Sequence, residues 1–102
     1  MPLPKYDKTL LVIVAEAVLE RALVRDATQL GAQAWTASEV RGAAREGLRE
    51  GQWEADRTVE LKLLCDAAVA DAIAEHVLRT YAGHYSVSMH FSPVQVLRPD
   101  RY

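Results

Sequence analysis

The sequence predicts an α+β domain in which a four-stranded antiparallel sheet carries two helices on one of its faces. Three observations lead to this fold class: short segments with alternating or continuous apolar residues, two stretches with helical spacing, and their order β-α-β-β-α-β. A chain of 102 residues is the size of one small domain. We therefore treat residues 1–102 as a single domain.

The first half of the chain has the pattern of a strand, a helix and a second strand. Thr9–Ala15 is a continuous apolar run of strand length, which is typical of a central strand. Apolar residues recur at helical spacing over Val18–Leu30, and Gly31 supplies a C-terminal stop. Ala34–Val40 then has the composition of a second strand.

The second half repeats the scheme after a long polar connection. Apolar and charged residues alternate over Thr58–Leu64, which predicts a third strand. Asp66 is placed to cap a second helix, in which apolar residues recur over Val69–Tyr81. Ser86–Phe91 alternates as a fourth strand, and Val94–Leu97 either continues that strand or forms a short extra one.

Charge and cysteine content exclude several classes of protein. The formal charge of −2 gives no broad attraction for nucleic acid, so no nucleic-acid partner is expected. The single cysteine, Cys65, excludes an internal disulfide framework and suits a reducing compartment. The apolar run Leu10–Ala15 is far too short to span a membrane, and Met1–Pro4 lacks a signal-peptide core. We therefore expect a cytoplasmic protein.

Helices on one face of the sheet leave the other face bare. The first strand has enough apolar residues to need cover on both faces, and an exposed sheet face would form a large apolar patch. A cyclic homo-oligomer with the sheets facing inward removes that patch.

The connection at about residues 41–57 is far longer than the roughly two to five residues of an ordinary hairpin. Its charges nearly balance and it contains several glycines, so a solvated loop remains one interpretation. A glycine beside an arginine also lets backbone N–H groups and a guanidinium converge on a phosphate. Trp53 is unusual in such a polar segment, and we expect Arg49 and Trp53 to contact a partner.

No pattern indicates a metal site or a catalytic nucleophile. His76, His84 and His90 lack the spacing of metal ligands, and His76 is interpreted as a helix-surface residue. Cys65 lies in an apolar run where an inert buried thiol is expected, and no serine has a nucleophile-elbow pattern. We therefore expect no metal, no cofactor and no enzymatic activity. At the chain end, Arg98 and Arg101 are either solvated or reach the phosphate ligand of a neighbouring subunit.

The run Thr36-Ala37-Ser38-Glu39-Val40-Arg41-Gly42-Ala43-Ala44-Arg45-Glu46 resembles the PII signalling-protein superfamily. In that superfamily the corresponding run is close to Thr-x-Thr-Glu-Val-Lys-Gly-x-Gly-Arg-Gln and stands at the entrance of a protruding T-loop. The match extends back without a gap to the first strand. The resemblance implies a ferredoxin-like βαββαβ fold, a trimer, and a T-loop at about 41–57.

The same resemblance implies that adenine nucleotides bind in clefts between subunits. Thr36 is then near the base, Gly42 and Arg45 face the phosphates, and the C-terminal arginines approach from a neighbouring subunit. The full set of nucleotide-binding residues implied in this way is Thr36, Ser38, Gly42, Ala44, Arg45, Arg98 and Arg101.

Three departures from the superfamily pattern concern the ligand. Glu46 and Glu16 stand where PII proteins carry a glutamine and a lysine, and two carboxylates repel an anionic 2-oxoacid. The loop has no tyrosine, which argues against uridylylation. A short turn, Tyr81–Tyr85, replaces the glycine-rich phosphate loop, which should weaken triphosphate binding more than mono- or diphosphate binding.

Val12–Glu16 and the short turn look more like the carbon-linked PII-like branch, with its carboxysome-associated and bicarbonate-transporter-associated members. That branch implies a non-enzymatic sensor of AMP, ADP, ATP or cyclic AMP, and in some members of bicarbonate. Its T-loop would signal inorganic-carbon or energy status to a target such as a bicarbonate transporter or a carboxysome-related protein. Contact with a membrane would then be only indirect, through a transporter.

One alternative shares the fold: a trimeric cation-tolerance-type protein that binds metal and has no nucleotide site. An acylphosphatase-type enzyme needs a phosphate cradle after the first strand, and the acidic Glu16–Val18 segment lacks the glycine for it. An RNA-recognition domain is disfavoured because the central strands lack paired aromatic residues.

Overall fold

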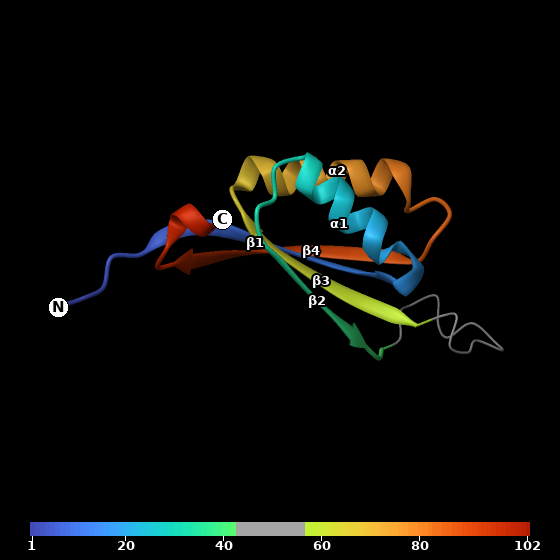
Figure 1. Cartoon of the computed structure of the whole chain (residues 1–102), viewed down its shortest axis with the longest axis horizontal. Helices are drawn as coiled ribbons and strands as arrows, with labels where there is room; N and C mark the ends of the chain where they lie inside the picture. The colour runs from blue at the N-terminus through green and yellow to red at the C-terminus, as the bar shows by residue number, and fades with distance from the viewer. Residues whose placement is uncertain (43–56) are drawn as a thin grey trace.

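A computed structural model describes residues 1–42 and 57–102. The elements in chain order are β1 (Tyr6–Glu16), the 3₁₀ turn η1 (Ala17–Leu19), α1 (Glu20–Gln29), β2 (Trp35–Val40), β3 (Thr58–Cys65), α2 (Ala67–Thr80), β4 (Val87–Val96) and the 3₁₀ turn η3 (Pro99–Arg101). The strands form one antiparallel sheet in the order β2-β3-β1-β4. Both helices lie on one face of this sheet (Figure 1), which confirms the predicted fold class.

The core lies between the two central strands and the helices. Alternate residues of β1 and β3 point to the helix face, and the apolar stripes of α1 and α2 close over them. The largest fully buried side chains are Leu11 and Ile13 of β1, Val59, Leu61, Leu63 and Cys65 of β3, Leu23 of α1, and Ile73 and Val77 of α2. This list confirms that the alternating and helical apolar patterns mark the core, and that the Cys65 thiol is buried.

The first and last strands are longer than the sequence pattern predicts. β1 begins at Tyr6 rather than Thr9, because Tyr6 and its neighbours pair with the end of β4, as in the Tyr6–Val96 pair. β4 runs through Pro93 without interruption, so the segment after Pro93 continues the fourth strand. Proline is tolerated there because β4 is an edge strand of this sheet, where one side needs no ladder hydrogen bond.

Asp66 occupies the N-cap position of α2, as predicted, but its side chain makes no cap hydrogen bond. Its carboxylate instead accepts a hydrogen bond from Lys8 Nζ at 2.7 Å. Thr9 pairs with Cys65 in the ladder, and Lys8 precedes Thr9 in β1 while Asp66 directly follows the end of β3. The predicted cap is therefore correct in position and wrong in mechanism.

The face of the sheet away from the helices is mixed in character. The register sets Val12 between Lys62 of β3 and His90 of β4, with Thr36 of β2 beyond Lys62. Val12 is only 3% exposed on this face. Both described α-helices lie on the opposite side (Figure 1), so a single chain leaves this face uncovered by helix.

We expect Gly31→Ala to lower the free energy of unfolding by about 1–2 kcal/mol. Gly31 follows α1 with φ of 121°, which L side chains rarely adopt, and an added Cβ would lie 3.4 Å from Val69. Urea unfolding measures the change. The control is Gly83→Ala, because a Cβ there meets none of the described residues within 4 Å and Gly83 has no positive φ. Equal stability of the two variants would contradict this account of Gly31.

Candidate functional site

β2 and β1 end at the same end of the sheet at which β3 and β4 begin (Figure 1). In the ladder, Val40 of β2 pairs with Thr58 of β3, and Thr58 pairs with Glu16 of β1. Ala15 pairs with Val87, so the turn before β4 arrives beside Glu16. We call this end of the molecule the loop end.

Three contacts tie the loop end together. The backbone N–H of Ala17 donates to the carbonyl of Arg57 at 2.7 Å, and Arg57 Nη1 lies 3.7 Å from Glu39 Oε2. On the other side of β1, the N–H of Ser86 donates to Glu16 Oε2 at 2.7 Å. The start of β3 and the α2–β4 turn are therefore both attached to the corner between β1 and η1.

The predicted nucleotide-facing residues of β2 share one side of that strand. Thr36 and Ser38 lie on the face away from the helices, since their neighbours Trp35 and Ala37 pair in register with the helix-facing Leu63 and Leu61. Gly42 follows the end of β2, and no heavy atom of the described residues would lie within 4 Å of a Cβ there. The predicted site residues Ala44, Arg45, Arg49 and Trp53 lie outside the described residues.

Arg98 and Arg101 lie at the opposite end of the sheet from Gly42. Arg98 precedes η3 and Arg101 is its last residue, and both line one open hollow together with Val96, Leu97 and Tyr102. Val96 pairs with Tyr6 at the start of β1, whereas Glu16 at the loop end is the last residue of that strand. One chain therefore brings the two arginines together but does not bring them to Thr36 or Gly42.

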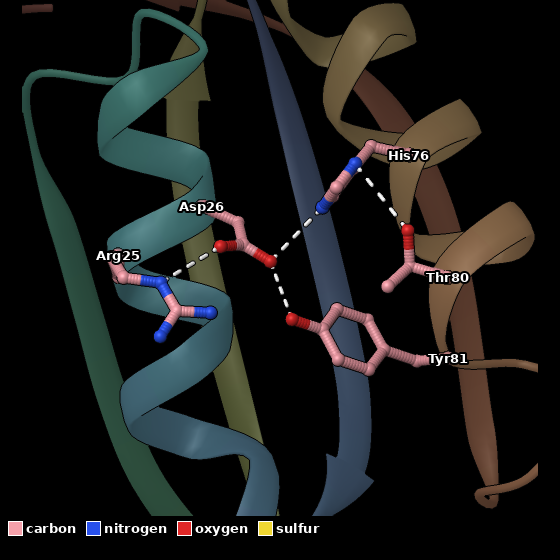
Figure 2. A network of polar contacts seen from close by, with 5 residues as sticks. All are labelled: Arg25, Asp26, His76, Thr80 and Tyr81. Atoms are coloured by element: carbon pink, nitrogen blue, oxygen red, sulfur yellow. Dashed lines mark hydrogen bonds and ion pairs between the residues drawn. The ribbon is translucent and has the colours of Figure 1, made fainter.

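Sequence reasoning missed a polar network between the two helices, which Figure 2 shows in close-up. Asp26 of α1 is 9% exposed, and its carboxylate accepts hydrogen bonds from the Tyr81 hydroxyl, from His76 Nε2 at 2.9 Å and from Arg25 Nε at 3.0 Å. Thr80 Oγ1 lies 3.5 Å from His76 Nδ1. The interpretation of His76 as a plain helix-surface residue is wrong, because this side chain joins α2 to α1.

The network holds Tyr81, the first residue of the turn between α2 and β4, against α1, and it changes the pKa values of Asp26 and Tyr81. Burial raises the pKa of Asp26, but hydrogen bonds from Tyr81, His76 and Arg25 outweigh it and hold this pKa below its ordinary value. The hydrogen bond to Asp26, with burial, raises the pKa of Tyr81. A sequence signal existed, since Asp26 lies beside the core residues Leu23 and Ala27 on the apolar side of α1.

Two further properties of the described residues limit the chemistry of the site. Among residues 1–42 and 57–102, no group of three or more histidine, cysteine or acidic side chains could hold a metal ion. Burial raises the pKa of the Cys65 thiol, so it is a poor nucleophile.

In the same ranges, no helix combines the length and the hydropathy needed to cross a membrane.

A comparison with family models gives a match that covers nearly the whole chain. The family model described as nitrogen regulatory protein P-II matches residues 8–101. A search of curated proteins gives no match. The family match includes β1 and η3, so it contains both the loop end and the C-terminal arginines.

Solved structures similar to this chain include several PII-like proteins. A PII-like signaling protein from Thermus thermophilus is 31% identical, with 98% of this chain and 99% of that chain covered and a TM-score of 0.83. CPII from Thiomonas intermedia, bound to ADP and bicarbonate, is 17% identical with 98% of each chain covered and a TM-score of 0.83. The B. subtilis GlnK–ATP complex is 16% identical, with 84% and 82% covered and a TM-score of 0.53.

We expect Asp26→Asn to lower the free energy of unfolding at pH 7 by about 1–3 kcal/mol, because an amide cannot satisfy all three donors. The folded-state pKa of Asp26 lies below 3.8, so its stabilisation is present above that value and is lost as the pH falls through the folded-state pKa. Urea unfolding from pH 7 to pH 3 should show the difference from wild type shrinking with acid. Asp71→Asn, on the exposed side of α2, is the control. A pH-independent difference would contradict the electrostatic account.

Proposed function

The chain belongs to the nitrogen regulatory protein P-II family, and we propose that it is a non-enzymatic sensor of adenine nucleotides. In this proposal AMP or ADP, and also ATP or cyclic AMP, bind in clefts between the subunits of a homotrimer. Nucleotide binding changes how the 41–57 segment, the T-loop, engages a target protein, with Arg49 and Trp53 as contact residues. Bicarbonate is proposed as a second ligand.

The observation that carries the proposal is that the predicted site residues of one chain lie at two opposite ends of the sheet. Thr36, Ser38 and Gly42 lead along β2 to the loop end, whereas Arg98 and Arg101 line a hollow at the other end. A complete site therefore needs these two groups from different subunits. The sheet face opposite the two described α-helices is a surface on which such subunits can meet.

Relatives support the choice of ligand. CPII from Thiomonas intermedia is bound to ADP and bicarbonate in one structure and to ADP, AMP and bicarbonate in another. The B. subtilis GlnK relative is bound to ATP. A cytoplasmic sensor of inorganic-carbon or energy status that acts on a bicarbonate transporter or a carboxysome-related protein fits these ligands.

Two measurements test the proposal directly. Native mass spectrometry should give three times the 11.3 kDa of one chain, and calorimetry should detect binding of AMP or ADP. A thermal-shift panel then adds ATP, cyclic AMP, bicarbonate and divalent cations. If millimolar adenine nucleotides give no heat and no shift while a divalent cation does, the cation-tolerance-type alternative replaces this function.

We expect Arg98→Ala to weaken AMP or ADP binding about tenfold and to leave the trimer intact, because a lost contact between a guanidinium and a phosphate costs affinity. Calorimetry measures the affinity and native mass spectrometry the assembly. Arg79→Ala removes the same charge from the exposed last turn of α2, outside the predicted site, and serves as the control. An unchanged affinity in the Arg98 variant would remove this residue from the site.

A further inference from the structure

The contact between Glu16 and Ser86 connects two segments that are 70 positions apart in the chain. Glu16 ends β1, the strand at the middle of the loop end, and Ser86 is the last residue before β4. The Glu16 carboxylate accepts the Ser86 N–H at 2.7 Å, which is a short hydrogen bond to a charged acceptor. The protein thus supplies its own anion to a backbone donor of the α2–β4 turn.

That turn is held at both ends by carboxylates from other elements. Its first residue, Tyr81, donates to Asp26 of α1, and its last residue, Ser86, donates to Glu16 of β1. Within the turn, the N–H groups of His84 and Tyr85 both donate to the carbonyl of Tyr81. The Ser86 N–H therefore lies at the loop end. An external anion can accept a hydrogen bond from it only by displacing the Glu16 carboxylate.

The row of residues at the loop end connects this donor to the T-loop entrance. Val40, Thr58 and Glu16 pair in sequence across β2, β3 and β1, and Ser86 stands next to Glu16 beyond them. Neighbouring strands are about 4.8 Å apart, so Glu16 is two strand spacings from the end of β2. A phosphate chain that begins beside Gly42 and extends along this row approaches the Glu16 carboxylate.

We propose that Glu16 is a specificity-determining residue that limits how many phosphates the nucleotide site accepts. This inference rests on the proposed nucleotide site. The Glu16 carboxylate already accepts the Ser86 N–H, which denies this donor to a further phosphate, so the site favours AMP over ATP. Any phosphate that reaches the turn must displace Glu16, and it then also disturbs the corner where Ala17 holds the carbonyl of Arg57.

Calorimetry of AMP and ATP with the full-length protein and two variants tests the inference. Glu16→Ala removes both the charge and the acceptor, whereas Glu16→Gln removes the charge and keeps an oxygen that can accept the Ser86 N–H. We expect Glu16→Ala to raise the affinity for ATP relative to AMP by about tenfold, and Glu16→Gln to raise it less. Glu75→Gln makes the same change in net charge on the exposed side of α2 and should leave the ratio unchanged.

Hydrogen exchange at the Ser86 amide supplies an independent readout. The Ser86 amide should exchange faster in Glu16→Ala than in wild type. If the alanine variant does not fold, the same two measurements are made on Glu16→Gln. If AMP binds and the ratio of ATP to AMP affinity stays within about twofold of wild type in every folded Glu16 variant, the inference is overturned. If no form binds any nucleotide, the proposed function fails, and this inference fails with it.

Discussion

The pairing of β1 with both of its neighbours is the constraint on which the rest of the structure depends. β1 is hydrogen-bonded to β3 on one side and to β4 on the other, over nearly its whole length. A slip of one residue in either ladder would turn Leu11 and Ile13 out of the core, so burial fixes the register. The same register decides that Glu16 meets Thr58 at one end and that Tyr6 meets Val96 at the other.

The helix layer is fixed by a second, polar constraint. Apolar burial holds α1 and α2 against the sheet, but it is non-directional and leaves the helices free to slide slightly. Asp26 adds direction, because its carboxylate accepts hydrogen bonds from His76 and Tyr81 of the other helix and its following turn. Asp26 therefore attaches the end of α2 and the first residue of the α2–β4 turn to α1.

Local patterns in the sequence were sufficient for the fold class and most of the core. The periods of apolar residues predicted each strand and helix, since an element must bury one face wherever it packs. The run from Thr36 to Glu46, together with the order of the elements, indicated the family. Lys8–Asp66, Asp26–His76 and Glu16–Ser86 could not be predicted, because each joins residues that are at least 50 positions apart, and local periodicity carries no information on such pairs. The two interpretations of Arg98 and Arg101 stay open, because the sheet register shows only that both residues lie away from β2 within one chain.

The separation of Gly42 from Arg98 within one chain has a genetic consequence. If each site takes one half from each of two subunits, a chain that lacks Arg98 still offers an intact β2 side to its neighbour. A second chain, altered at Thr36 or Gly42, still offers intact C-terminal arginines. Co-expression of these two inactive alleles would then yield mixed trimers in which some interfaces join two intact halves. The gene would show complementation between alleles, which a site contained within one chain cannot give.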